Sequence, residues 1–148
     1  MSYVSDPISL VRSKVKALLK DKLPSGTELY EDRPEMGPTV PCIIMQVIAG
    51  ITKESGMGEV KDAETKSHRV FVVVQFDAYH DTSTGKDALS NLLLNEIWKG
   101  RHALKAGGVE YEGFPRVPTD LPADQVGSRL FRSSCDCRFS VEMTAALS

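Results

Sequence analysis

The sequence contains no long apolar run, and this absence argues against a membrane-spanning segment. Its longest apolar stretches, residues 40–49 and 70–74, are strand-sized and far shorter than the ~20 residues that cross a bilayer as a helix. The chain begins with no basic region ahead of an apolar core, unlike a signal peptide. We therefore expect no membrane partner and synthesis in a reducing cytoplasm.

A strong excess of charge of one sign is also missing. The 18 Lys and Arg residues and the 20 Asp and Glu residues leave a net charge of −2, whereas nucleic-acid binders usually carry a marked basic excess on one face. We therefore expect no direct sequence-specific binding of nucleic acid, which still leaves room for a local basic patch. With 148 residues, 41% hydrophobic and 26% charged, the chain is expected to form one globular domain over residues 1–148.

Cysteine is scarce, and its odd count excludes a disulfide framework. The three cysteines are Cys42, Cys135 and Cys137. On a strand, the last two would point to one face about 6.6 Å apart along it, which suits a disulfide poorly. We interpret all three as small buried apolar side chains. The three histidines stand at no ligand spacing to the cysteines, so we expect no metal site.

Motifs for catalysis are absent as well. The sequence has no phosphate-binding loop, no dinucleotide-binding turn and no hydrolase or metalloprotease signature. The one local group with acid/base potential is Asp77, His80 and Asp81, a composition equally typical of a strand-to-helix turn. Cys42 lies in an apolar strand, where burial disfavours the thiolate. We therefore expect that the protein is not an enzyme and binds no cofactor. The alternative is a small enzyme whose site lies around His80.

What the sequence does contain begins with an amphipathic helix. Asp6 and Pro7 suit a helix cap and a first helical turn, and apolar residues then recur at helical spacing. A Pro-Ser-Gly turn at residues 24–26 ends this segment. The opposite face, either a contact surface or a plain solvated face, carries Arg12, Lys16 and Lys20.

A second helix is predicted after the long central strand. Thr84 followed three residues later by Asp87 indicates its cap, and Gly100 is a plausible terminator. A short helical turn around residues 103–104 is expected to follow.

The remaining pattern predicts strands at 28–32, 40–49, 68–79, 109–112 and 129–143. Neighbouring strands joined by loops favour antiparallel pairing, and two amphipathic helices would cover one face of such a sheet. The expected fold class is α+β, with a mostly antiparallel sheet of four to five strands, two helices on one face and a long β-hairpin arm or loop. Residues 113–127, with three prolines, are expected to form a loop.

The arm is predicted over residues 50–67, a glycine-rich and charged segment without sustained periodicity. Connections longer than about 12–15 residues are usually functional or disordered. It is either a contact arm or a tolerated surface insertion. The contact residues expected here are Lys53, Glu54, Lys61, Asp62 and Lys66.

The final strand, 129–143, alternates between an apolar face and a charged face. The apolar side consists of Phe131, Cys135, Cys137, Phe139, Val141 and Met143, interrupted by Ser133. The charged side, which suits contacts through paired opposite charges, consists of Arg132, Asp136, Arg138 and Glu142.

Three features together resemble the bacteriophage tail-completion and tail-terminator proteins, the small neck proteins of phage tails. A helix leads through residues 30–34 into the apolar strand at 40–45, a strand ending at 77–79 leads into the helix at 87–98, and a proline-rich loop leads into 129–143. The resemblance is to the overall layout and covers most of the chain. It implies an α+β fold and assembly into a closed ring, usually a hexamer, through head-to-tail contacts.

The resemblance also implies a function and partners. It implies a structural virion protein of the tail or neck, made in the host bacterial cytoplasm, that caps the tail tube and joins it to the head–neck connector. The implied partners are copies of itself, the tail tube protein, a neck or connector protein and the sheath protein. The alternatives are another head–tail connector component, a tail-assembly chaperone or monomeric binding module, and a small cytosolic enzyme.

Overall fold

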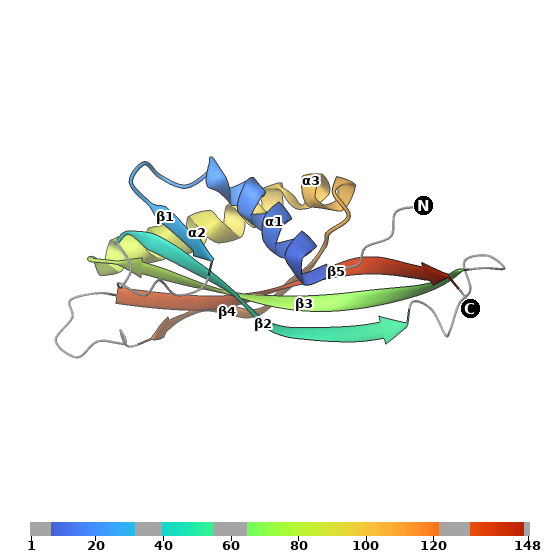
Figure 1. Cartoon of the computed structure of the whole chain (residues 1–148). Coiled ribbons are helices and arrows are strands. Elements are labelled where there is room, and N and C mark those ends of the chain that lie inside the picture. Colours follow the sequence, from blue (N-terminus) through green and yellow to red (C-terminus); the bar gives the residue numbers. More distant parts are fainter. Residues whose placement is uncertain (1–6, 32–39, 55–64, 122–130, 147–148) are drawn as a thin grey trace.

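The structure is a computed structural model that describes residues 7–31, 40–54, 65–121 and 131–146. In these ranges the chain forms a five-stranded mixed sheet and three helices, an α+β architecture (Figure 1). The elements in chain order are α1 (Pro7–Lys20), β1 (Glu28–Glu31), β2 (Cys42–Glu54), β3 (Thr65–His80), α2 (Ser83–Lys99), α3 (Arg101–Ala106), β4 (Glu110–Leu121) and β5 (Phe131–Ala146).

The strands lie in the order β1-β2-β3-β5-β4, and three of the four pairings are antiparallel, as predicted. The exception is β1, which runs parallel to β2 with Glu28 opposite Cys42. The sequence-based expectation of antiparallel neighbours was wrong here. Residues 32–41 are long enough to carry the chain back to the level of Glu28 before β2 begins, whereas an antiparallel pair needs only a short turn.

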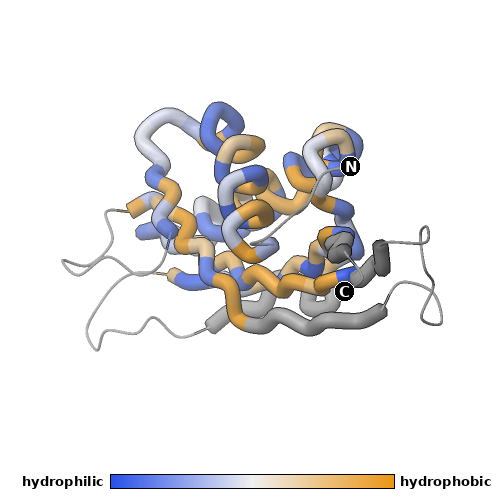
Figure 2. Tube along the Cα trace, turned by 45° about the vertical axis from the view of Figure 1, so that its right-hand side comes forward, coloured by the Kyte–Doolittle hydropathy of each residue, from blue (hydrophilic) through white to orange (hydrophobic). Residues whose placement is uncertain are grey.

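The core lies between the helices and one face of the sheet. Every fourth residue of α1 on its inner side is buried, as is the corresponding stripe of α2, and both pack on β3 and β5. In Figure 2 the strands under the helices are largely hydrophobic. Burying one such side chain stabilises the fold by roughly 1.5–3 kcal/mol. The central members of this core are Val11, Val15, Leu19, Leu89, Leu93, Ile97, Val74, Phe76 and Phe139.

Helix α2 begins two residues earlier than the sequence predicted. Its N-cap is Thr82, not Thr84, and the Thr82 hydroxyl accepts a hydrogen bond from the Gly85 amide at 3.0 Å. Thr82, which comes shortly after the end of β3 at His80, has the extended backbone that a cap requires. Gly100 ends the helix as predicted, with its amide bonded to the Glu96 carbonyl at 2.9 Å.

The sheet extends into the segment predicted as a β-hairpin arm or loop, and also into the segment 113–127 that was predicted as a loop. β2 and β3 remain paired as far as Glu54 and His68, so the arm begins as a β-ladder, and residues 55–64 lie outside the described residues. β4 runs through most of the expected 113–127 loop. Its register shifts three times against β5, and Gly113 has a positive φ. Such irregularities on an edge strand accommodate prolines, which cannot donate to a ladder.

Within the described ranges, no helix combines the length and apolar character needed to cross a bilayer.

Candidate protein-contact surfaces

The sheet face away from the helices holds a buried ion pair. The Arg132 guanidinium lies 3.1 Å from the Asp77 carboxylate, and both side chains are largely buried. Gln75 donates to Asp77 at 3.2 Å and to the Ser134 hydroxyl at 2.9 Å, and the Arg132 guanidinium stands 5.8 Å from the centre of the Tyr79 ring. Arg132, predicted as a contact residue, is therefore engaged inside its own chain.

A second polar network joins three strands at the other end of this face. Arg69 of β3 donates to Glu110 of β4 and to the Ser140 hydroxyl of β5, both at 2.9 Å. Ser140 in turn donates to Glu112 at 2.6 Å. Glu142, another predicted contact residue, lies 3.9 Å from Arg69 and is half-buried. These bonds tie β4 to the rest of the sheet.

The structure does not gather the nine predicted contact residues into one site. Lys53, Glu54 and Lys66 lie at the arm end, where Lys53 is opposite Arg69 and Lys66 opposite Ala145. Arg132 lies opposite Tyr79. Tyr79 is roughly 40 Å from Lys66 along β3, at ~3.3 Å per residue.

Two of the others, Asp136 (half-buried) and Arg138 (exposed), lie between these ends, and Lys61 and Asp62 fall outside the described residues. Their role in contacts stays a prediction.

The acid/base cluster is split by the sheet. Asp77 points to the face away from the helices, whereas His80 lies beside α2, with Nδ1 2.8 Å from Asp81 and 3.1 Å from the Thr82 amide. His80 also lines a pocket of about 340 Å³ between the turn after α1 and the first half of α2. Of the described residues that line it, His80 alone carries an acid–base group, and apolar groups supply most of the wall. No carboxylate is among these described lining residues.

The cysteines are free and buried, which confirms their interpretation as apolar side chains. Burial raises the pKa of the Cys42 thiol to about 11. Burial, and then the neighbouring Cys135, raise the pKa of Cys137 still further. A thiol with such a pKa is protonated at neutral pH and is a poor nucleophile. Among the described residues, no three His, Cys, Asp or Glu side chains form a metal-binding group.

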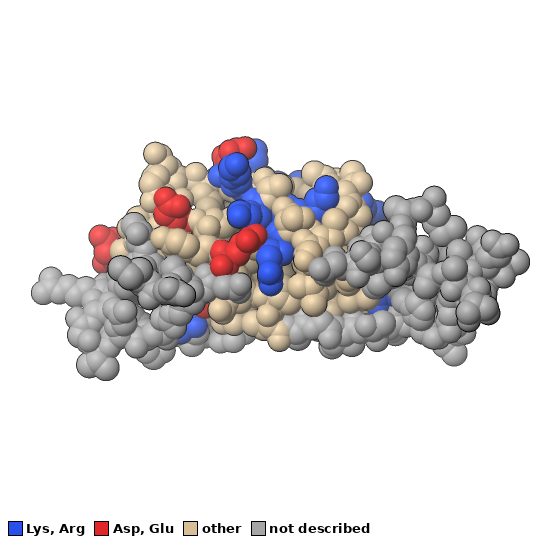
Figure 3. All heavy atoms as spheres, viewed as in Figure 1, with Lys and Arg blue, Asp and Glu red and all other residues tan. Residues whose placement is uncertain are grey.

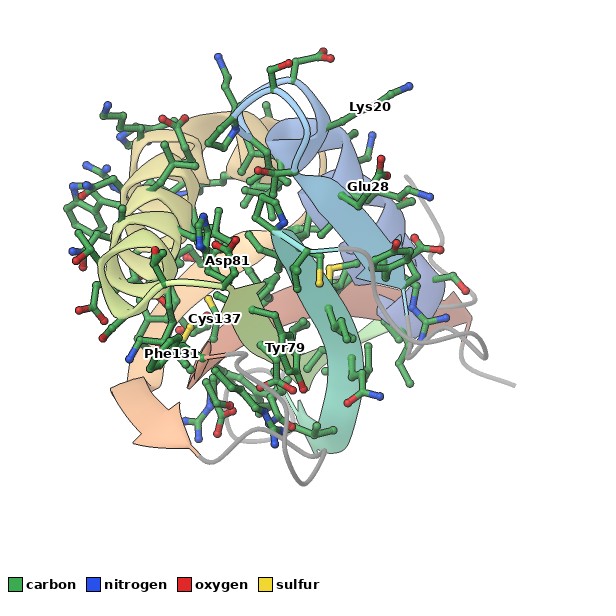
Figure 4. All side chains as sticks on the ribbon, turned by 90° about the vertical axis from the view of Figure 1, so that its left-hand side faces the viewer. Lys20, Glu28, Tyr79, Asp81, Phe131 and Cys137 are labelled. Atoms are coloured by element: carbon green, nitrogen blue, oxygen red, sulfur yellow. The ribbon has the colours of Figure 1, made fainter. Side chains whose placement is uncertain are left out.

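Among the described strands, two sides of the sheet have an edge without a pairing strand. β1 covers only Cys42–Met45 of β2, so no described strand pairs with residues 46–54 on that side. β4 is the strand at the opposite edge. In Figure 4, α1, β1 and β2 lie on one side of the molecule, with Lys20, and α2 lies on the other, with Phe131. Each side therefore presents both a sheet edge and a helix.

Exposed apolar side chains mark the same two sides, and sequence reasoning missed them. They are Ile8, Ile48, Trp98 and Phe131, each 39–51% exposed. Trp98 stands off the buried i, i+4 stripe of Leu89, Leu93 and Ile97 in its helix. That offset is the signal that could have identified it.

The Trp98 ring is part of an aromatic cluster that rises from the core. Its centre lies 5.8 Å from that of Tyr111, which in turn lies 6.5 Å from the buried Phe139. The Arg101 guanidinium stacks 3.7 Å above Trp98. Trp, Tyr and Arg are the residue types enriched at the energetic centres of protein interfaces.

Comparison with known proteins finds a likeness to a solved structure. No protein-family model matches the chain, and no curated protein matches it. A similar solved structure is the sheath/tube terminator of an extracellular contractile injection system, PVC, in its extended state, with a TM-score of 0.57 and 12% identity. The match covers 100% of this chain and 58% of that protein. At this identity, the likeness establishes a shared fold.

Proposed function

We propose that this protein is a tail terminator, a structural component that assembles with copies of itself at the end of a phage or phage-like tail tube. The observation that carries the proposal is that the whole chain, from end to end, matches the fold of a sheath/tube terminator. The layout of helices and strands in the sequence supports the same family independently of that match.

The proposed partners are copies of the chain, the tube protein, a neck or connector protein and the sheath protein. The similar solved structure is a terminator of a sheath and a tube, which supports those two partners. A closed hexamer is the form that the resemblance to tail terminators implies, and heterologous contacts that repeat by rotation can close into such a ring. The protein would then act in the virion tail, as a structural component and without a cofactor.

The two open sheet edges support this mode of assembly. A copy that offers the 46–54 stretch of β2 can receive β4 of the next copy, because strand addition at a free edge satisfies unpaired backbone groups. The two edges lie on opposite sides of one sheet, so the contact is head-to-tail. A stable contact of this kind usually buries about 1,600 Å² in total.

The test is capture by tail tubes. Purified protein is mixed with tubes assembled from the tube protein of the same tail system, and tube ends are imaged by negative-stain electron microscopy. The proposal predicts ring-shaped density at tube ends and an arrest of tube growth. Tubes that continue to grow with bare ends, at protein concentrations well above that of tube ends, would overturn it.

A further inference from the structure

We infer that neighbouring copies meet through two helix stripes of opposite character. The first, the α1 stripe, consists of Ile8, Arg12, Lys16 and Lys20. The second, the α2 stripe, consists of Asp87, Asn91, Leu94 and Trp98. The α1 stripe of one copy would dock on the α2 stripe of the next, and this inference rests on the proposed self-assembly.

The α1 stripe faces away from the other helices. Its members recur at every fourth position, so they share one side of α1. The opposite side of α1 approaches the glycines at the ends of α2 and α3, with Leu18 against Gly100 and Lys14 against Gly107. Lys16 lies 3.7 Å from Glu31 of β1, which places the stripe on the β1 side. Within the described part of the chain, no element covers this stripe, which suits a contact beyond the molecule.

This stripe is cationic with an apolar end. Ile8 is 39% exposed, and Figure 3 shows Lys and Arg side chains gathered over α1. Glu31 offsets the charge of Lys16, whereas within the described part of the chain Arg12 and Lys20 form no ion pair. As far as the described residues go, these two positive charges are left for a neighbouring copy to neutralise.

The α2 stripe faces the opposite way. Gly85, Leu89 and Leu92 line the pocket toward the turn after α1, so the stripe occupies the other flank of the helix. That flank is on the β4 side, because Trp98 contacts Tyr111 of β4.

The α2 stripe is acidic at its start and aromatic at its end. The Asp87 side chain is 62% exposed, and Asp81, just before the helix, adds a second carboxylate that is 70% exposed. Trp98 supplies a large exposed ring next to Arg101. Acidic groups opposite Arg12 and Lys20 would steer and register the contact, and Trp98 would anchor it.

A second copy of the chain is the occupant that these surfaces fit. Both halves of the contact are on one molecule, on opposite sides, so each copy supplies what its neighbour lacks (Figure 4). The open stretch of β2 lies on the α1 side, and β4 lies on the α2 side. Helix docking and strand addition would therefore join the same two sides and form one continuous head-to-tail interface.

The test uses two charge-reversal variants, alone and mixed. Arg12→Glu/Lys20→Glu makes both stripes negative, and Asp81→Lys/Asp87→Lys makes both positive. Each variant alone should need at least about tenfold more protein to assemble than the wild type. An equimolar mixture should assemble again, because each negative α1 stripe then meets a positive α2 stripe and each positive α1 stripe a negative α2 stripe.

The control is Lys14→Glu/Lys22→Glu, which makes the same change in net charge with two exposed lysines outside the α1 stripe. It should assemble like the wild type. Circular dichroism checks that every variant is folded, which matters most for Asp87 because it pairs with the buried Lys86.

If the wild type assembles and the reversed variants do so equally well, or if the mixture fails to recover although both variants are folded, the stripes are not the interface. If the wild type itself never assembles, alone or on tail tubes, the proposed function fails instead.

Discussion

Arg132 lies on a strand face that the sequence predicted to be exposed, yet it forms a largely buried ion pair with Asp77 of the same chain. Alternation along 129–143 predicts an outward-facing Arg132, yet its partner lies on the neighbouring strand and is 4% exposed. Removing one member of a buried pair leaves the other charge without compensation.

We therefore predict that Arg132→Met lowers the free energy of unfolding by about 3 kcal/mol. Urea denaturation of the purified protein measures this. The double variant Arg132→Met/Asp77→Asn should recover part of the loss, because no charge is then left buried alone. A loss below about 0.5 kcal/mol, the range of ordinary surface substitutions, would contradict the assigned role.

Cys42 gives a prediction for the pH dependence of stability. Its pKa is raised from 9.0 to about 11 in the folded chain, so the folded state retains a proton that the unfolded state loses. This stabilising contribution is fully present below pH 9 and declines as the pH rises from 9 through 11.

Between pH 9 and 11, wild-type stability should therefore fall more steeply than that of Cys42→Ala, by up to about 2 kcal/mol. Denaturant titrations of both proteins at several pH values test this difference. Parallel curves for the two proteins would show that the thiol does not contribute. Lysines and tyrosines also titrate in this range, and comparing the two proteins removes their common effect.

At the scale of elements, hydrophobic periodicity predicted those helices and strands that are defined by one buried face. α1, α2 and the apolar side of β5 follow from spacing, because a buried stripe must recur at helical or strand period. Two features depend on longer-range pairing that spacing does not encode: the parallel direction of β1 and the continuation of β4 through its prolines. The contact surfaces were harder to predict than the strands, because the exposure of Trp98 depends on how the buried stripe of α2 orients the helix.

The N-cap of α2 is Thr82 in the structure, whereas the sequence predicted Thr84, and mutation can distinguish the two. Thr82→Ala should lower the free energy of unfolding by about 1 kcal/mol, because it leaves the Gly85 amide without its acceptor. Thr84→Ala, at an exposed position in the first turn, should change it by less than about 0.5 kcal/mol. Thermal denaturation compares the two, and a larger effect at Thr84 would restore the original assignment of the cap.

At the scale of the whole molecule, the arm and the two open sides belong to one proposal for assembly. Deleting residues 52–65 removes the outermost β2–β3 pairs and leaves those from Cys42 to Ile51 in place. We expect the shortened chain to remain folded, as judged by circular dichroism, and to assemble more weakly, as judged by sedimentation velocity. Normal assembly of the folded, shortened chain would show that the arm makes no contact between copies.

Self-assembly of the chain can be measured by multi-angle light scattering over a range of concentrations, with and without tail tubes. We expect a discrete species near six times 16.2 kDa, the mass of one chain, or depletion of the free protein when tubes are added. A mass of 16.2 kDa at every concentration, with no loss of free protein to the tubes, would contradict it.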